Sequence, residues 1–263
     1  MTAAAPWAPL EREIAQWARA GPGPPTFWWR DDDASGPGAA LERLLDLSGR
    51  AGVPLALAVV PRWADPDLGP RLAARGPGLL SVLQHGVAHE NRAPAGERSS
   101  EFPAGCDPGA ALASIAAAHE RLASLLGDLV CPVFVPPWNR IDPAVASGLT
   151  RIGFRGLSAF GRHPKAPRIE GLARLDTQAD VIDWRGTRGF VGTGVAVAQL
   201  VADLAARRRG EVEPTRPTGL LTHHLVHDRA VWSFLAELIE VVSQGVRWMG
   251  APAVLAASSD DAG

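Results

Sequence analysis

Two histidines four residues apart form the first pattern in this sequence that could do chemistry. His85 and His89 stand in the segment QHGVAHE, residues 84–90. A spacing of four places both imidazoles on one side of a helical turn, and Gly86 lets the backbone leave a preceding strand sharply. Two neutral imidazoles with one carboxylate are a common catalytic site for zinc and similar ions. Alone, the pattern is weak evidence, because histidines at this spacing are often ordinary surface or core residues.

A run of three aspartates, Asp31, Asp32 and Asp33, supplies candidate carboxylates. The run directly follows the segment FWWR, residues 27–30. Adjacent carboxylates at a strand end repel one another unless a cation or a shared proton offsets their charge. A divalent ion would supply that cation, with one aspartate bound to it and a neighbour acting as general base toward water. A solvated loop or a helix N-cap is the alternative interpretation.

Two further segments carry candidate residues. The segment LLTHHLVHD, residues 220–228, holds three of the seven histidines, among them His223 and His224. A histidine here could protonate a leaving group, because imidazole is the side chain best matched to that task near neutral pH. In PPWN, residues 136–139, the prolines hold Trp138 where its flat ring could receive a sugar, and Asn139 follows it.

All four segments lie at the ends of predicted strands. Apolar runs predict strands at residues 26–29, 55–60, 79–83, 133–135, 156–160, 181–184 and 219–222. Helical patterns alternate with them at 39–51, 66–74, 109–126, 143–152, 195–208 and 230–243. Repeated strand-then-helix units favour a parallel sheet, and about seven strands predict an α/β fold of the distorted (β/α)7-barrel type. The carboxyl ends of such strands share one rim, where active sites are built. An open doubly wound sheet is the structural alternative.

The bulk composition narrows the class of protein. The chain has 263 residues, 46% hydrophobic content and a net charge of −2, which predicts one globular domain over 1–263 without attraction to nucleic acid or membrane. The sequence has no nucleotide-binding glycine motif and no GxSxG nucleophile elbow. We find no secretory signal, which predicts a cytoplasmic protein whose two cysteines stay reduced.

The ordered set of segments resembles the polysaccharide deacetylase family, also called the NodB-homology group or carbohydrate esterase family 4. The resemblance covers about residues 26–228. Its segments in this sequence are DDD at 31–33, HGVAH at 85–89, VPPW at 135–138, DVIDW at 180–184 and LTHH at 221–224. It implies a distorted barrel that uses a metal-activated water to remove an acyl group, typically N-acetyl, from a small acylated sugar or a glycan.

The resemblance also implies roles for particular residues. The metal ligands would be Asp33, His85 and His89, with Asp32 as catalytic base and His224 as acid. The ion would be divalent, with zinc expected and cobalt, nickel or manganese as alternatives. Trp138, Asn139 and His223 would contact the substrate.

Several assignments stay open at this point. The aspartate triplet also allows Asp31 as base and Asp32 as ligand, and His223 competes with His224 for the role of acid. Val135 stands where the family has an arginine, so Arg30 or Arg140 is expected to orient the base instead. The alternatives in function are a cyclic-amide hydrolase on the same scaffold, a glycan-binding protein without turnover and a metal-free structural domain.

Overall fold

The computed structural model describes residues 6–20, 23–75, 78–161 and 168–260. Among these residues the centre is a curled, nine-stranded sheet in which all neighbouring strands run parallel. The strand order is β6-β5-β4-β3-β2-β1-β8-β7, and β9 pairs with the start of β1. The strands are β1 (Thr26–Ala34), β2 (Leu55–Val59), β3 (Leu80–His85), β4 (Val130–Val135), β5 (Gly156–Leu157), β6 (Ala173–Arg174), β7 (Ala179–Asp180), β8 (Thr218–Thr222) and β9 (Arg247–Trp248).

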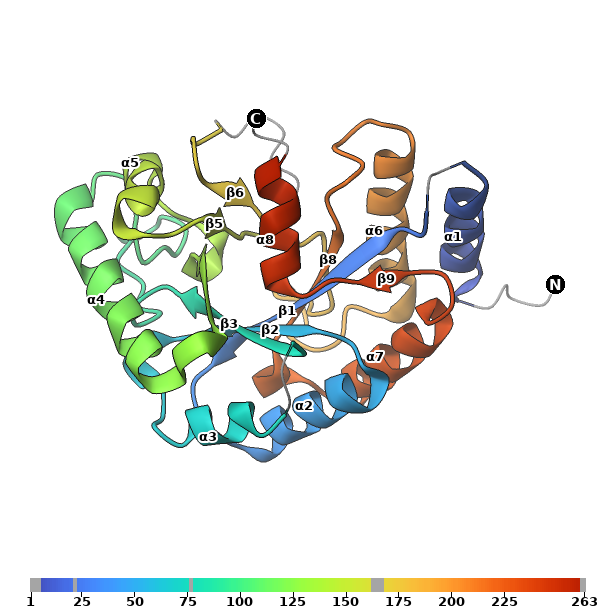
Figure 1. The fold of residues 1–263 in the computed structure, drawn as a ribbon, viewed down its shortest axis with the longest axis horizontal. Coiled ribbons are helices and arrows are strands. Elements are labelled where there is room, and N and C mark those ends of the chain that lie inside the picture. The colour runs from blue at the N-terminus through green and yellow to red at the C-terminus, as the bar shows by residue number, and fades with distance from the viewer. Residues whose placement is uncertain (1–5, 21–22, 76–77, 162–167, 261–263) are drawn as a thin grey trace.

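Helices surround this sheet (Figure 1). They are α1 (Ala8–Ala20), α2 (Ala39–Ala51), α3 (Leu68–Ala73), α4 (Pro108–Leu126), α5 (Pro143–Gly148), α6 (Thr193–Arg208), α7 (Arg229–Val242) and α8 (Ala251–Asp260). Three short 3-10 helices follow strands at the rim: η1 (Pro61–Trp63) after β2, η3 (Pro137–Asn139) after β4 and η5 (His224–Val226) after β8. Asp107 caps α4, since its carboxylate accepts the backbone N–H groups of Gly109 and Ala110.

The alternation of side chains along β1 separates two hydrophobic layers. Phe27 and Trp29 belong to the large cluster between the sheet and the outer helices. Trp28 belongs to a different cluster inside the barrel, with residues of β2, β3 and β4. Because successive side chains of a strand point to opposite faces, Arg30 and Asp32 continue the interior face whereas Asp31 continues the outer one. Helix α8 closes one end of the interior, where Ala251 and Val254 pack in the inner cluster.

The predicted distorted barrel is confirmed, and the open doubly wound alternative is wrong because the sheet curls around its own inner cluster. The elements β6, β9, α1 and α8 were not predicted from the sequence. The strand expected at 181–184 begins two residues earlier, at Ala179–Asp180. The missed strands are two residues long, too short to show an alternating pattern. Helix α1 is rich in charged residues and gave no apolar run. Within the described part of the chain, no helix has the length and apolarity needed to cross a membrane.

Candidate active site

Three side chains from the ends of β1 and β3, two strands separated in the sheet by β2, meet at the rim of the barrel. Oδ1 of Asp33, at the end of β1, lies 3.1 Å from Nε2 of His85 and 3.4 Å from Nε2 of His89. His85 ends β3, and His89 follows in the loop after it. One ligand atom from each residue lies within 4.8 Å of the other two. This is a donor set of two imidazole nitrogens and one carboxylate oxygen, which suits a divalent ion such as zinc.

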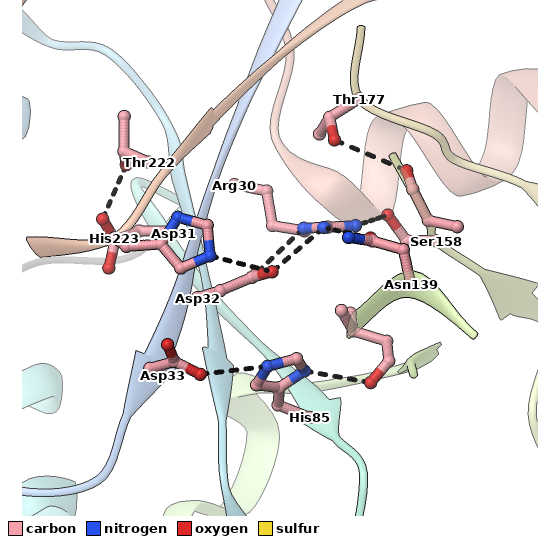
Figure 2. Close-up of polar contacts among 12 residues, drawn as sticks. Arg30, Asp31, Asp32, Asp33, His85, Asn139, Ser158, Thr177, Thr222 and His223 are labelled. Atoms are coloured by element: carbon pink, nitrogen blue, oxygen red, sulfur yellow. Dashed lines mark hydrogen bonds and ion pairs between the residues drawn. The ribbon is translucent and has the colours of Figure 1, made fainter. Parts of the chain in front are cut away.

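The hydrogen bonding of His85 tests whether these residues fit a cation. Its Nδ1 lies 3.0 Å from the carbonyl oxygen of Val135 and so donates to it, which leaves Nε2 facing the Asp33 carboxylate (Figure 2). A lone pair on Nε2 would repel that carboxylate, so a proton or a metal ion belongs between them. A histidine held by a backbone carbonyl at its far nitrogen is the usual arrangement of a metal ligand. The residues therefore fit the metal that the sequence predicted.

The pKa values of these groups follow from their mutual contacts. Burial alone would raise the pKa of Asp33, but the hydrogen bond and charge of His85 outweigh it and lower the pKa well below its usual range. Burial opposes protonation of His85, yet the negative charges of Asp32 and Asp33 raise its pKa. The pKa of His89 is lowered, first by burial and then by the charge of His85. An ionised carboxylate beside an unprotonated imidazole is the state that binds metal.

Backbone strain gathers around this site. Among the described residues, five non-glycine residues have positive φ, and four of them are Asp33, His89, Trp138 and Asn139. Left-handed conformations cost free energy for residues with a Cβ and persist where the surroundings enforce them, often at functional sites. The irregular register of β1 between Asp31 and Ala34 turns the Asp33 side chain out of strict alternation. These conformations place Asp33, His89 and the two η3 residues at positions that regular strands would not give them.

Asp32 faces the barrel interior and is paired with Arg30. Nη2 of Arg30 donates to Oδ2 of Asp32 at 3.0 Å, and Nε lies 2.9 Å from Oδ1. The guanidinium in turn donates to Ser158 Oγ at 2.5 Å and to Asn139 Oδ1 at 3.3 Å (Figure 2). Oδ1 of Asp32 has no well-directed hydrogen bond within the described structure. Both oxygens of the carboxylate thus lie against the guanidinium, which holds the carboxylate in place.

Of the two arginines expected to replace the family arginine at Val135, Arg30 makes the contact with Asp32. Arg140 instead donates from Nη1 to the carbonyl oxygen of Ser99 at 2.8 Å. Ser158, which the sequence analysis did not single out, fixes the far side of the Arg30 guanidinium. No local pattern marks this serine, because its role depends on the pairing of β4 with β5.

The two adjacent histidines after β8 have different surroundings. Nε2 of His223 lies 3.9 Å from Oδ2 of Asp32, and its ring packs edge-on against Trp184 at 4.7 Å. His224 points to the other face, where Nδ1 donates to Oδ1 of Asp31 at 2.5 Å and only 1% of the side chain is exposed. This geometry argues against the sequence-based preference for His224 as the acid, because the side chain that lies beside Asp32 is that of His223.

Asp31 accepts hydrogen bonds from the two residues that flank His223. Its Oδ2 accepts the hydroxyl of Thr222 at 2.6 Å and the backbone N–H of His224 at 3.0 Å. Burial would raise the pKa of Asp31, but the charge and hydrogen bond of His224 reverse the shift and lower it. The same pair raises the pKa of His224 against the effect of burial. Asp31 is thus a buried structural anion on the outer face, which argues against the register that made it the base.

Tryptophans line the rim around these groups. The Trp138 ring lies 4.3 Å from the His89 ring, and Trp63 donates from Nε1 to the Ala88 carbonyl at 2.9 Å. Trp184, packed on His223, donates to Oδ2 of Asp180 at 2.9 Å. Trp63 and Trp184 are 57% and 42% exposed, so much of their ring surface is free to contact a ligand.

Asp180 is a buried acid close to His223. Its pKa is raised, above all by burial, and the positive charge of His223 works against that rise. Oδ1 of Asp180 accepts the backbone N–H of Ile182 at 2.9 Å. Both its oxygens are therefore engaged, and it fixes Trp184 against His223.

Solved structures with this fold support the resemblance predicted from the sequence. A candidate polysaccharide deacetylase from Mycobacterium smegmatis superposes with a TM-score of 0.62 at 17% identity, over 91% of this chain and 92% of that one. A family 4 acetyl xylan esterase from Clostridium thermocellum, in complex with a cobalt ion, gives 0.51 at 15% identity over 88% and 90%. The chain therefore has the fold of the carbohydrate esterase family 4 deacetylases.

Other comparisons limit the conclusions about function that this structural similarity supports. A mutant of a carbohydrate esterase family 4 pseudoenzyme also superposes, with a TM-score of 0.57 at 14% identity over 89% of this chain and 68% of that one. No protein-family model matches the sequence, and no curated protein matches it. At these identities the likeness establishes the fold, and activity has to be argued from the site.

Proposed function

We propose that this chain is a metal-dependent hydrolase that removes an acyl group, N-acetyl in the first instance, from an amino sugar or a related glycan. The observation that carries the proposal is the convergence at one rim of the triad Asp33, His85 and His89 with Asp32 and His223. A metal triad, a carboxylate and an imidazole are the groups that metal-assisted amide hydrolysis needs.

The triad would hold one divalent ion, for which zinc suits the two imidazoles and the carboxylate best, with cobalt, nickel and manganese as alternatives. When bound, the ion would polarise the acyl carbonyl and lower the pKa of a water molecule. Asp32 would take the proton from that water as general base. Its carboxylate, fixed by the ion pair with Arg30 and close to His223, is the group suited to accept that proton.

We assign the general acid to His223 rather than to His224. The acid must reach the nitrogen that leaves as an amine, on the same side of the barrel as Asp32. His223 Nε2, 3.9 Å from Asp32 Oδ2, meets that requirement. His224 has its Nδ1 committed to Asp31 and is buried on the opposite face of the strand.

The aromatic rim supports a sugar as the substrate. Sugar rings have apolar faces that pack on flat aromatic side chains, and a site usually combines such walls with a few polar groups. Trp138 beside His89 and Trp184 beside His223 would form two such walls on either side of the scissile bond. Asn139, whose Oδ1 accepts from Arg30, would offer its amide nitrogen to a sugar hydroxyl or acyl oxygen.

Two competing functions differ from this one in what they require of the site. A glycan-binding protein without turnover has no need of a base, yet the Arg30 and Asp32 pair and His223 are both present. A cyclic-amide hydrolase would use the same groups on a different substrate. The solved structures with this fold include enzymes that act on acetylated carbohydrates, which favours the sugar.

The experiment begins with elemental analysis of the purified protein. The protein is then stripped with a chelator, reloaded in turn with Zn²⁺, Co²⁺, Ni²⁺ and Mn²⁺, and assayed for acetate release. The panel contains N-acetylated amino sugars, their oligomers, O-acetylated sugars and small cyclic amides. We expect metal-dependent acetate release from an N-acetyl sugar and none after chelation. Ring opening of a cyclic amide without acetate release would show that the substrate is a cyclic amide and not an acetylated sugar. Bound metal without hydrolysis of any compound would favour a glycan-binding protein without turnover.

A further inference from the structure

Glu101 is a buried carboxylate that contacts the loop between the two histidine ligands. Its side chain belongs to a residue only 1% exposed. Oε2 accepts the backbone N–H of Val87 at 3.0 Å, and Oε1 accepts the backbone N–H of Ala88 at 2.7 Å. Both oxygens of one carboxylate thus bind two consecutive amides between His85 and His89.

These two hydrogen bonds complete the set of partners for this stretch of backbone. The carbonyl of Val87 accepts the backbone N–H of Arg62 at 2.9 Å, and that of Ala88 accepts Trp63 Nε1 at 2.9 Å. Every backbone donor and acceptor of Val87 and Ala88 therefore has a fixed partner. A loop whose polar groups are all paired has few alternative conformations, because each alternative leaves a buried group unpaired.

The segment that carries Glu101 is itself fixed on both sides. Asn91 Oδ1 accepts the backbone N–H of Ser100 at 3.0 Å. On the same side, Arg140 donates from Nη1 to the carbonyl of Ser99 at 2.8 Å. On the other side, Phe102 forms a β-bridge with Ile141. The Glu101 carboxylate is consequently attached to a rigid part of the rim.

Gly86 shows how closely the carboxylate approaches the loop. Gly86 has a φ of 60°, and a Cβ placed on it would collide with Glu101 Oε2 and lie 2.5 Å from Cγ of Pro137. The contact brings a second negative charge near the ligands without making it a ligand, since both of its oxygens are already engaged by amides.

We propose that Glu101 is a positioning residue for the metal site, which shapes the 86–89 loop so that His89 is presented to the ion beside His85 and Asp33. The inference rests on the proposed function, because it presumes that the triad binds a metal. His89 sits in a left-handed conformation, with a φ of 56°, which an unsupported loop would relax. With the loop released, His89 would move away from the triad while His85, fixed on β3 and on Val135, would stay.

The test is Glu101→Gln, which keeps size and one acceptor but puts an NH₂ group against a backbone N–H. The probe is Zn²⁺ alone, with its affinity for the chelator-stripped protein measured by competition with a chromophoric chelator. The control is Glu97→Gln, an exposed carboxylate four residues earlier in the same segment. We expect about a 10- to 100-fold loss of Zn²⁺ affinity in Glu101→Gln and none in Glu97→Gln. The absorption spectrum of bound Co²⁺ should also change, because His89 leaves its position.

The outcomes separate this inference from the proposed function. Zn²⁺ affinity equal to wild type in a folded Glu101→Gln protein would overturn the inference and leave the metal site intact. A wild-type protein that binds no Zn²⁺ would overturn both. If Glu101→Gln does not fold, Glu101→Asp replaces it, since it keeps the charge but falls one methylene short of the two amides. In that case wild-type affinity in the aspartate variant overturns the inference, and a loss of affinity supports it.

Discussion

Nη2 of Arg30 donates to Oδ2 of Asp32 at 3.0 Å, although the two residues lie only two positions apart on β1. Side chains two apart on a strand share a face, so one strand supplies both the candidate base and the cation that orients it. The pair lies inside the barrel, with Arg30 completely buried. The arginine expected at Val135, on β4, is thus replaced by a residue on a different strand that reaches the same carboxylate.

Replacing Arg30 by lysine should lower the catalytic rate more than it lowers the free energy of unfolding. Lysine keeps the charge but loses the planar fork that reaches Asp32, Ser158 and Asn139 together. We expect kcat/KM to fall by about tenfold or more, which corresponds to about 1.4 kcal/mol of transition-state stabilisation. Arg174→Lys is a matched control, because Arg174 forms a pair with Asp176 at the same spacing away from the proposed centre. Equal losses in both variants would show that the geometry of the Arg30 pair is unimportant for turnover.

The three adjacent aspartates should give three different phenotypes when each is changed to asparagine. Asp33→Asn should lose metal, since the ligand oxygen is weakened. Asp32→Asn should keep metal but lose about two to four decades of kcat, the usual scale for acid–base catalysis. Asp31→Asn should be less stable by about 3–5 kcal/mol, because it breaks a buried charged pair with His224. Metal content, kcat and urea unfolding measured side by side on the three variants would separate these roles, and full activity in Asp32→Asn would refute the assignment of the base.

Much of this arrangement could be predicted from the sequence, and the limits have physical causes. The order of the polar segments at strand ends was sufficient to predict the barrel and to predict that Asp33, His85 and His89 lie together at one rim. Strand alternation, applied one step further, would have predicted the placement of two of the three aspartates, because Trp28, Arg30 and Asp32 share the inner face, which leaves Asp31 outside. It would likewise have separated His223 from His224. Glu101 had no such signal, because it follows an exposed polar stretch and its contacts depend on how a loop returns to the rim.

Exchanging His223 and His224 for glutamine in turn should distinguish a catalytic from a structural histidine. His223→Gln should fold normally and lose kcat most strongly for substrates whose leaving amine needs a proton. A substrate with a leaving group that departs without protonation should be affected much less. His224→Gln should mainly lower the midpoint of thermal unfolding, because it leaves the Asp31 carboxylate buried without its charged partner. A selective loss of kcat in a stable His224→Gln protein would mean that His224, and not His223, is the acid.

His89→Ala is the expected way to empty the metal site without disturbing the core. The His89 side chain is 27% exposed, so truncation removes a ligand at little cost in packing. We expect loss of metal after dialysis and a thermal midpoint that no longer rises when Zn²⁺ is added, whereas the wild type should be stabilised by bound metal. A Zn²⁺-dependent rise of the same size in the variant would mean that the ion binds elsewhere.

His227 should make the protein less stable as the pH falls below about 6.5. Burial lowers the pKa of His227 to about 4, and its Nε2 accepts the backbone N–H of His223 at 3.3 Å. A protonated ring could not accept that bond. Between the two pKa values, His227 is protonated in the unfolded chain but neutral in the folded protein. Its contribution to the free energy of unfolding is therefore fully present above the unfolded pKa and is lost as the pH falls toward 4.

The comparison that isolates this effect is wild type against His227→Gln. His85 and His224 have raised pKa values and contribute with the opposite sign, and His89 and His119 have lowered pKa values, so the pH profile of the wild type alone mixes several groups. Glutamine keeps an acceptor for the His223 N–H but does not titrate. We expect the stability difference between wild type and variant to shrink by roughly 3 kcal/mol between pH 7 and pH 4. Urea unfolding at four or five pH values measures it, and a difference that stays constant with pH would mean that His227 titrates alike in both states.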